Sequence, residues 1–398
     1  MSVFEDIALL NKKGMVFGVE TTRRILDALG SPDKNLKIVH IAGTNGKGSI
    51  AEYITRILIA SGKRVGTFSS PMVESYFDQF RIDGEPVEES VLAKYFGEAY
   101  SAADSAATGF EVETAGILNA FSGEGCEYAV VECGLGGKLD ATNAIANKEV
   151  AVISSVGLEH TAVLGNSLRS ICEHKAGIIR DCPVVVNALQ EAETAEYFRS
   201  LGAIFADKRF EFLSADLNGT RFVYDGEEYF TPMYGRAQAY DAATAIEAAR
   251  ILKIDKNSIR VGISRAKLAG RLQIMQALGN TYIIDGGHNP SGMKPLRELL
   301  SSFGGKKITL VYGSLSDKDI DGNLFNLRGL PKKVYAVTPE SPRAMDRDKL
   351  LSACKKYFAD VEYADSVSDA LSASDGVVAV CGSFTLVKEA LNWIEKRL

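Results

Sequence analysis

Short apolar runs rich in β-branched residues alternate with segments of helical spacing between residues 37 and 186. The apolar runs predict strands over 37–41, 64–68, 128–132, 150–155 and 183–186. The spacing between them predicts helices over 48–61, 88–103 and 167–179. Strands that are apolar throughout, without alternation, are typical of a parallel sheet that helices cover on both faces.

The pattern changes after residue 210. The polar, glycine-containing stretch 210–229 predicts a small antiparallel hairpin, 239–252 a helix and 272–285 a strand. A second alternation follows, with strands expected over 308–312, 334–337 and 376–381 and helices near Ser291, near Arg347 and over 386–396. Because the chain of 398 residues is long for one core, we predict two α/β domains. These are a P-loop-type, mostly parallel ATPase domain over 1–274 and a smaller Rossmann-like domain over 275–398.

Composition narrows the possible functions. Hydrophobic residues make up 46% and charged residues 24% of the chain, which is typical of a soluble globular protein. The net charge of −6 argues against binding to nucleic acid, which requires a basic surface. No C-x-x-C pair occurs among the six cysteines, no apolar run reaches 18 residues, and the N-terminus lacks the order of a signal peptide. We therefore expect a cytoplasmic protein without a membrane partner.

A glycine-rich segment, HIAGTNGKGS, occupies residues 40–49 between the first predicted strand and its helix. Such a turn directs backbone N–H groups and the positive end of the helix at a phosphate. Lys47 adds a positive charge for the outer phosphates. The segment departs from G-x-x-x-x-G-K-[ST], because Ile41 and Gly48 stand where that pattern requires Gly and Ser or Thr. The alternative is a strand-to-helix turn without a ligand.

Glu132 ends a buried strand, at the edge of the sheet where open α/β folds bind ligands. A carboxylate there suits Mg²⁺, which prefers oxygen ligands and usually keeps several waters. A strand-end cap or an ion pair is the alternative role for this residue. The glycines that follow do not form G-x-G-x-x-G, because Leu139 occupies the third position, so dinucleotide binding is not predicted.

His160 and Lys175 are the next candidates for chemistry. His160 follows the predicted strand 150–155, at the same edge of the sheet. Lys175 lies on a predicted helix beside apolar neighbours, and a buried lysine loses its charge and becomes nucleophilic. A structural histidine and an ordinary solvated lysine are the alternatives.

A second glycine-rich turn, IIDGGHNP over 283–290, follows the strand predicted near the domain boundary. It carries Asp285, His288 and Asn289, and Arg271 precedes it. Ligand sites are common where two domains meet, so these residues are candidates for a second part of the site. Polar turn residues that cap the next helix are the alternative.

Together these segments resemble the folylpolyglutamate synthase and dihydrofolate synthase family of the Mur ligase superfamily, from about Val16 to Phe384. The resemblance rests on HIAGTNGKGS, the turn Ser69-Ser70-Pro71, ECGLGGKLDATN, SSVGLEHTAVLG, HKAGII, AGR and DGGHNPSG, in the family's order. YGSLSDKD and CGSF, over 312–319 and 381–384, match its C-terminal signatures.

The resemblance implies that ATP phosphorylates a folate-type carboxylate and that the amino group of L-glutamate displaces the phosphate to form an amide. It implies these nucleotide contacts: Asn45, Gly46, Lys47, Gly48, Ser49, Asp241, Arg271 and Asp285. It implies Mg²⁺, with two ions expected, at Ser69, Glu132, His160 and Lys175, the last being carbamylated. The substrate contacts implied are Asp140, Ala141, His288 and Ser383, and the catalytic residues are Lys47, Lys175 and His288. Relatives suggest a monomer.

Several positions depart from the family's pattern. Met72 stands where the family has His, Asp78-Gln79-Phe80 replaces Glu-Arg-Ile, and Asp241 replaces the adenine-contacting Asn. Because the departures at residues 72–80 fall on the pterin side, a related ligase for a non-folate acid is the alternative. A regulatory ATP-binding protein without catalysis is a further alternative, which the presence of Lys47, Glu132, His160 and Lys175 argues against.

Overall fold

The computed structural model describes residues 2–12, 14, 16–70, 72 and 75–398. Pro71, which belongs to the expected Ser69-Ser70-Pro71 turn, lies outside the described residues. Contacts divide the chain into two compact units. Unit 1 comprises Met1–Ser214, Thr220–Pro232 and Ala237–Ala266, and unit 2 comprises Ala215–Gly219, Met233–Arg236 and Lys267–Leu398. The boundary expected at 274/275 falls inside a strand that pairs within unit 2.

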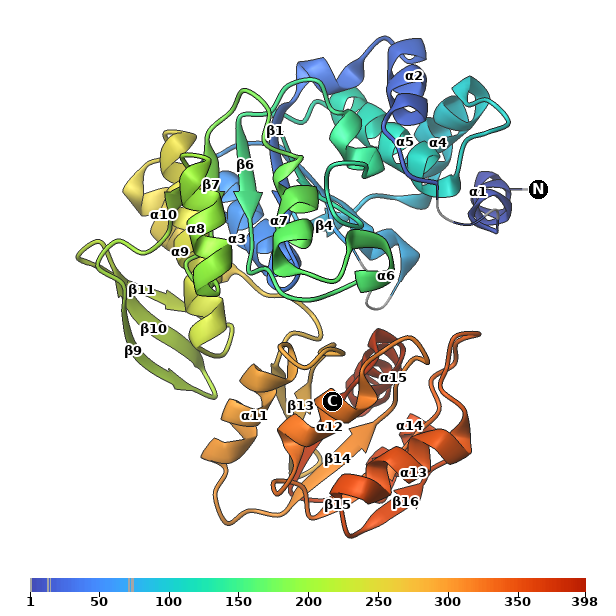
Figure 1. The fold of residues 1–398 in the computed structure, drawn as a ribbon, viewed down its shortest axis with the longest axis vertical. Coiled ribbons are helices and arrows are strands. Elements are labelled where there is room, and N and C mark those ends of the chain that lie inside the picture. The colour runs from blue at the N-terminus through green and yellow to red at the C-terminus, as the bar shows by residue number, and fades with distance from the viewer. Residues whose placement is uncertain (1, 13, 15, 71, 73–74) are drawn as a thin grey trace. The chain divides into compact units, whose positions relative to one another are not determined.

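An eight-stranded sheet in the order β4-β3-β2-β5-β1-β6-β7-β8 forms the centre of unit 1 (Figure 1). The pairs from β2 to β8 are parallel, whereas β3 runs antiparallel to β2 and β4. The register places Ile41 of β1 beside Glu132 of β5, so these two strands end level with each other. The strands are β1 (Lys37–Ala42), β2 (Val65–Phe68), β3 (Phe80–Ile82), β4 (Glu85–Pro86), β5 (Tyr128–Glu132), β6 (Val150–Ile153), β7 (Val184–Val186) and β8 (Ile204–Phe205).

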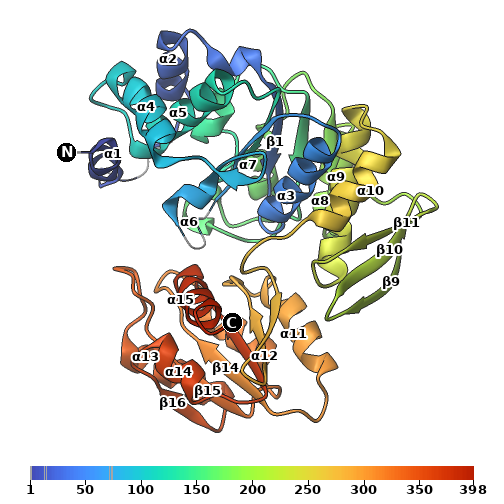
Figure 2. The same ribbon diagram turned by 180° about the vertical axis from the view of Figure 1, so that it is seen from behind.

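Helices cover both faces of this sheet, as the unalternating strands predict. Figure 1 shows α7 and α8 over one face, and Figure 2 shows α3 with α10 packed against it over the other. The helices of unit 1 are α1 (Val3–Asn11), α2 (Glu20–Ala28), η1 (Pro32–Asn35), α3 (Lys47–Ala60), η2 (Tyr76–Gln79), α4 (Glu89–Ala102), α5 (Gly109–Gly123), η3 (Ala141–Ala144), α6 (Thr161–Leu164), α7 (Leu168–Ala176), α8 (Ala192–Ser200), α9 (Arg236–Ile251) and α10 (Lys256–Arg265).

The segment 210–229 forms three strands rather than the predicted hairpin. They are β9 (Glu211–Asp216), β10 (Gly219–Tyr224) and β11 (Glu227–Thr231), in the order β11-β10-β9. Two turns, at 217–218 and 225–226, divide the segment, and Asp225 and Gly226 both have positive φ. The prediction allowed for one turn only and was wrong in this respect.

Unit 2 is built on a six-stranded sheet in the order β12-β13-β17-β14-β15-β16. Its strands are β12 (Gln273–Ala277), β13 (Asn280–Ile284), β14 (Ile308–Tyr312), β15 (Lys333–Ala336), β16 (Val361–Tyr363) and β17 (Val377–Cys381). All neighbours are parallel except β12 and β13, which form an antiparallel pair where one strand over 272–285 was predicted. Its helices are α11 (Met293–Ser302), α12 (Ile320–Leu327), α13 (Arg347–Tyr357), α14 (Val367–Ser372) and α15 (Phe384–Glu395).

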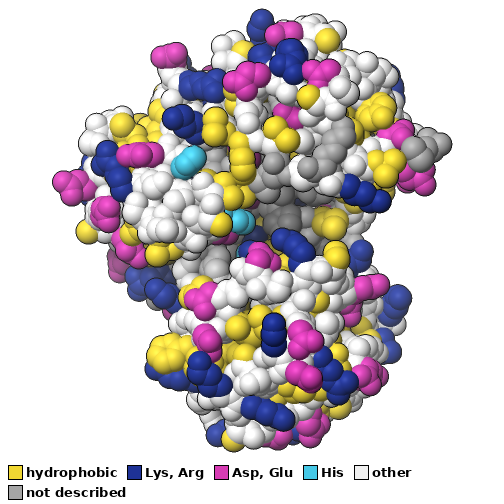
Figure 3. Space-filling model, turned by 45° about the vertical axis from the view of Figure 1, so that its right-hand side comes forward, with side chains coloured by type: hydrophobic (Ala, Val, Ile, Leu, Met, Phe, Trp, Pro, Cys, Tyr) yellow, Lys and Arg dark blue, Asp and Glu magenta, His cyan; other side chains and the backbone are white. Residues whose placement is uncertain are grey.

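Charged side chains of both signs are interspersed on the face shown in Figure 3, among the residues coloured there. This distribution agrees with the acidic net charge and differs from the continuous basic surface that nucleic acid requires. Within the described ranges, no helix has the length and apolar character needed to cross a membrane.

Glu113 of α5 is a buried carboxyl group that the sequence analysis did not assign to the site. Its Oε1 accepts a hydrogen bond of 2.7 Å from Tyr76 Oη of η2. Burial raises the pKa of Glu113 to about 7, and hydrogen bonds from Tyr76 and Asn11 oppose the rise. The carboxyl group thereby connects α5, η2 and α1.

Glu113→Gln is expected to stabilise the protein at pH 8 but not at low pH. The folded-state pKa of about 7 lies above the unfolded value of 4.5, so the wild-type free energy of unfolding falls as pH rises between these values. The variant escapes this loss, which is about 3 kcal/mol at pH 8. Urea unfolding at pH 5 and pH 8 measures it, with Glu98→Gln on the exposed face of α4 as the control. An equal difference at both pH values would contradict the assignment.

Candidate functional site

The loop between β1 and α3 is shaped to bring backbone N–H groups to an anion. Gly46 has a φ of 92° and offers no side chain to cap the first turn of α3, which begins at Lys47. Gly43 has a φ of 148°, and a Cβ there would lie 1.8 Å from Ser154 Oγ. Only glycine allows this close approach. The free N–H groups and the helix dipole make a site for phosphate.

The same loop is fixed to the segment that follows β6. Ser155 O accepts hydrogen bonds from Thr44 N at 2.8 Å and from Asn45 N at 3.2 Å. Ser155 Oγ donates to Asn45 O at 3.0 Å, and Thr44 Oγ1 bonds with the backbone of Gly157. The loop is therefore held in place by its neighbour before any ligand binds.

Glu132 lies against the loop at the carboxyl end of β5. It is 3% exposed, and its Oε1 lies 3.7 Å from Lys47 Nζ. Its Oε2 accepts a hydrogen bond of 3.2 Å from Ser70 N, which places the Ser69–Ser70 turn beside it. The ion pair that the sequence left open as an alternative is present, at the edge where a metal ligand was expected.

Lys175 of α7 is buried, so the alternative of a solvated lysine is wrong. The side chain is among the largest that are fully buried, and Nζ donates a hydrogen bond of 2.6 Å to Gly43 O. Burial, together with the positive charge of Lys47, lowers the pKa of Lys175 to about 8, while Glu159 opposes the shift. The neutral fraction of this amine near neutral pH is therefore larger than that of a solvated lysine.

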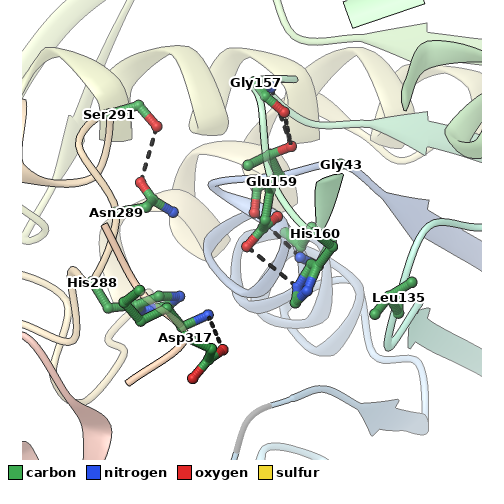
Figure 4. A network of polar contacts seen from close by, with 12 residues as sticks. Gly43, Leu135, Gly157, Glu159, His160, His288, Asn289, Ser291 and Asp317 are labelled. Atoms are coloured by element: carbon green, nitrogen blue, oxygen red, sulfur yellow. Dashed lines mark hydrogen bonds and ion pairs between the residues drawn. The ribbon is translucent and has the colours of Figure 1, made fainter. Parts of the chain in front are cut away.

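His160 lies at the start of α6, with the uncommon φ of 49° for a residue with a side chain. Figure 4 shows its ring beside Glu159, and His160 Nε2 lies 3.7 Å from Glu159 Oε1. The residue is exposed and lines the cavity described below, and Glu159 lies beside it. Among the described residues, no group of three His, Cys, Asp or Glu side chains is arranged to hold a metal.

Asp241 of α9 reaches the phosphate loop from another part of unit 1. A Cβ on Gly46 would lie 2.6 Å from Asp241 Oδ1, which also accepts a hydrogen bond of 2.8 Å from Asn187 Nδ2. One turn earlier, Gln238 Nε2 donates to Ser49 Oγ at 3.2 Å. The structure thus brings two expected nucleotide contacts, Ser49 and Asp241, to the same loop.

Unit 1 also contains a cavity of about 450 Å³, a size suited to a small organic ligand. Asp140 and Ala141 line it, as does His160, which Figure 4 shows near Leu135. Burial raises the pKa of Asp140, against the hydrogen bonds from Leu135 N and Thr142. The full lining is Asn11, Gly14, Val16, Phe17, Thr108, Phe110, Glu111, Gly134, Leu135, Leu139, Asp140, Ala141 and His160.

Unit 2 carries the remaining expected residues. Asp285 ends β13, is nearly buried, and accepts a hydrogen bond of 3.2 Å from Leu272 N. Burial raises its pKa to about 6, and Arg271 opposes the rise. The Arg271 guanidinium lies 4.9 Å from the centre of the Phe384 ring. In unit 2, these residues share the carboxyl ends of β13 and β17.

His288 and Ser383 lie at the same ends of these two strands. His288 Nδ1 is 2.9 Å from Gly286 O, and its ring centre is 6.1 Å from that of Phe384. Ser383 Oγ accepts a hydrogen bond from Thr385 N and caps α15. The capping alternative given for the turn at 283–290 is wrong for its side chains, because α11 begins after Gly292 without a side-chain cap. Asn289 Oδ1 instead accepts hydrogen bonds within the turn, from Gly292 N and from Ser291 Oγ, the latter drawn in Figure 4.

Several side chains that shape the site were not predicted from the sequence. Thr44 and Ser155 fix the phosphate loop, Asn187 holds Asp241, and Glu159 accompanies His160. Asn187 directly follows β7, so its place at a strand end was a usable signal. Thr44 and Ser155 act through contacts between segments 113 and 110 residues apart, which no local pattern reveals.

Comparison with known families agrees with this architecture. The model of the Mur ligase middle domain matches residues 41–249, and that of the Mur ligase glutamate ligase domain matches residues 270–384. The dihydrofolate synthase/folylpolyglutamate synthase of Escherichia coli (strain K12) is 32% identical over 404 residues, which cover 98% of this chain and 94% of the relative.

Solved structures show the same fold. FolC of E. coli, in complex with DHPP and ADP, superposes with a TM-score of 0.88 at 30% identity, covering 100% of this chain and 98% of that one. A bifunctional folylpolyglutamate synthase/dihydrofolate synthase with Mn, AMPPNP and L-glutamate bound gives a TM-score of 0.86 at 29% identity, covering 99% and 98%. The resemblance found in the sequence is confirmed, and the chain belongs to the folylpolyglutamate synthase and dihydrofolate synthase family of Mur ligases, which are ATP-dependent ligases that form amide bonds.

Proposed function

We propose that this protein uses ATP to join the amino group of L-glutamate to the carboxylate of a folate-type acid. The observation that carries the proposal is the meeting of Lys47, Glu132 and Lys175 around one phosphate loop, in the unit whose cavity Asp140 lines. Relatives that share the whole fold have been solved with ADP and DHPP, and with Mn, AMPPNP and L-glutamate, which supports each substrate class.

The reaction has two steps, and the phosphate loop serves the first. A carboxylate oxygen of the acid attacks the γ-phosphorus of ATP, and ADP leaves with the bonding electrons. The glutamate amine then attacks the acyl carbon, phosphate leaves, and the nitrogen loses a proton to give the amide. The N–H groups over 46–49, in the first turn of α3, and the Lys47 ammonium would balance the negative charge that spreads over the transferring phosphoryl group.

The donors at Glu132 fit a divalent cation that accompanies ATP. Mg²⁺ usually binds one or two protein carboxylates, substrate phosphates and several waters. A single buried carboxylate beside the phosphate loop, without a cage of three acidic or histidine ligands among the described residues, suits that mode. We propose Glu132, Ser69 and His160 as its ligands. The bound cation would neutralise charge on the phosphates.

Lys175 is proposed as a site of carbamylation. Its neutral amine would attack carbon dioxide and release a proton, which converts a buried cation into a carboxylate-like group. Burial beside Lys47 supports this, because the positive amine is the disfavoured form there. The carbamate oxygens would serve a second Mg²⁺ ion.

The remaining expected residues complete the proposal. Asn45, Gly46, Gly48, Ser49 and Asp241 of unit 1 are proposed as nucleotide contacts. Arg271 and Asp285 of unit 2 are proposed as nucleotide contacts in their own right. His288 and Ser383 are proposed for L-glutamate, and Asp140 and Ala141 for the folate-type acid. We further propose that the protein is cytoplasmic, since all six cysteines are free and five of them are buried. The proposal of a monomer rests on the family resemblance alone.

The departures at residues 72–80 give limited support to a non-folate acid, because most of them have structural roles. Asp78 Oδ2 accepts a hydrogen bond of 2.6 Å from Ser75 N in a capping box. Phe80 is fully buried and stacks on Phe68 with ring centres 5.4 Å apart. Met72 is half exposed and is the departure left without such a role.

Phosphate release from Mg-ATP and L-glutamate tests the function. Dihydropteroate, tetrahydrofolate and no acid are compared, and the products are weighed by mass spectrometry. We expect release that depends on a folate acid, with a mass gain of one glutamyl residue. Release with other carboxylic acids alone would favour the related ligase, and nucleotide binding without release on any acid would refute the proposal.

A further inference from the structure

We propose that His40 and Thr142 form a hydrogen-bonded relay that presents the Asp140 carboxylate to the acid substrate as a fixed hydrogen-bond acceptor. His40 and Thr142 would then be positioning residues for substrate binding, since Asp140 is the group that lines the cavity. This inference rests on the proposed function and deepens it by explaining how the cavity recognises its ligand.

Three side chains, one from β1 and two from the start of η3, form a continuous series of hydrogen bonds. His40 lies inside β1 and is fully buried, with Nε2 2.8 Å from Thr142 Oγ1. Thr142 Oγ1 lies 2.5 Å from Asp140 Oδ1, and Thr142 N donates to the same oxygen at 3.0 Å. On the other side of the carboxylate, Leu135 N donates to Oδ2 at 2.7 Å.

The number of protons on these side chains determines which group donates each hydrogen bond. The Thr142 hydroxyl has one proton with which to donate a hydrogen bond. The Asp140 carboxylate is the stronger and closer acceptor, so the hydroxyl donates its hydrogen bond to Asp140. His40 must then donate its Nε2 proton to Thr142 Oγ1. Cys133 Sγ, 3.1 Å from the same nitrogen, shares that proton as a weak acceptor.

The surroundings of His40 favour this tautomer. Its Nδ1 is buried and has no hydrogen-bond partner among the described residues. An unprotonated Nδ1 with a lone pair tolerates the lack of a partner better than a protonated Nδ1 would, because buried N–H groups without a partner are rarer in proteins than buried acceptors without one. Burial and the nearby charges of Lys148 and Arg180 lower the pKa of His40 well below its usual value, so the ring stays neutral.

The relay leaves the carboxylate ready for a ligand. Thr142 holds Oδ1 with two hydrogen bonds and Leu135 N holds Oδ2 with one, while the backbone of Gly134 also favours the ionised carboxyl group. An N–H group on the substrate would approach Oδ2, which accepts fewer of these short hydrogen bonds. Because both oxygens are held by fixed donors, Asp140 would meet this group without losing rotamer freedom on binding.

Thr142→Val tests the relay, because valine keeps the shape of threonine but cannot pass on a hydrogen bond. We expect the KM for the folate-type acid to rise about tenfold, which corresponds to about 1.4 kcal/mol. The KM for ATP and kcat should change less than twofold. Thr142→Ser retains the hydroxyl and should restore the KM for the acid to within about threefold of wild type.

Thr194→Val is the matched control, since Thr194 on α8 is another fully buried threonine whose hydroxyl contacts only Cys172 Sγ, at 3.7 Å. It should leave every KM unchanged. A Thr142→Val variant with wild-type KM, or a serine variant as impaired as the valine variant, would overturn the relay. Absence of turnover by the wild-type protein on any folate acid would instead refute the proposed function.

The histidine tautomer is a second readout that needs no activity. Only four histidines occur, so ¹⁵N-histidine labelling gives few imidazole signals, and His40→Gln identifies the one from His40. We expect a neutral ring with its proton on Nε2 between pH 6 and pH 8. A proton on Nδ1, or an imidazolium in this range, would overturn the relay even if the substrate were unknown.

Discussion

Replacement of Lys175 by alanine is expected to lower kcat about a thousandfold, a loss of about 4 kcal/mol of transition-state stabilisation. The side chain is buried beside the phosphate loop, and its amine has a pKa lowered to about 8. Alanine cannot form a carbamate, so added bicarbonate should not restore the rate. Steady-state phosphate release with and without bicarbonate measures the effect.

Lys148 supplies a matched control for this experiment. It is another largely buried lysine of unit 1 with a pKa lowered to about 8, but it bonds Asn143 Oδ1 and Ile178 O away from the phosphate loop. Lys148→Met should keep kcat within about threefold of wild type. ¹³C-labelled carbon dioxide should give a carbamate signal in the wild type and in Lys148→Met, but not in Lys175→Ala. A wild-type rate for Lys175→Ala would refute the proposal that a carbamate on Lys175 takes part in the reaction.

Apolar runs in the sequence located β1, β2, β5, β6 and β7 of the large sheet, because buried parallel strands are apolar on both faces, but they did not reveal the short strands β3, β4 and β8. The run 128–132 coincides with β5, and the other predicted strands of that sheet differ from the observed ones by at most two residues at either end. Helix α5 has no distinct polar face, since residues on all its sides are buried, so helical periodicity did not reveal it.

Missed turns were one source of error, at one of the two positions 217–218 and 225–226 and between β12 and β13. Leu278 and Gly279 separate β12 from β13, and Leu278 adopts a φ of 52° that side chains rarely take. A leucine in that position is not a turn signal, so the sequence predicted one strand over 272–285. Strand pairing, rather than local preference, imposes the turn.

The parts of the candidate site that lie at the carboxyl ends of buried strands were predictable from the sequence. Glu132 and His160 were found because polar residues after buried strands mark the ligand edge of a sheet. The ion pair between Lys47 and Glu132 was not predictable in the same way, since it depends on β5 lying next to β1. Strand order is a property of the whole fold, and so is the relay that joins His40 to Asp140.

Glu132→Gln is expected to abolish Mg-dependent turnover, lowering kcat about a thousandfold, while the fold stays intact. Glutamine keeps the volume of the side chain and the acceptor for Ser70 N, but it lacks the charge that suits a divalent cation. Removing that charge also leaves Lys47 beside a neutral group. Initial rates over a range of Mg²⁺ concentrations, together with thermal unfolding, separate the loss of metal binding from loss of structure.

Glu127→Gln is the matched control, because it removes the same glutamate charge at the opposite end of the same strand. Glu127 immediately precedes the same strand, β5, but lies at its opposite end, where it is partly exposed and pairs with Lys37 and Lys63. Because ligands bind at the carboxyl ends of parallel strands, removing a charge from the amino end should leave kcat and the Mg²⁺ dependence unchanged. If Glu132→Gln kept Mg-dependent turnover, or if both variants lost it equally, the metal site would have to lie elsewhere, and the carboxyl end of β5 would serve only to hold Lys47.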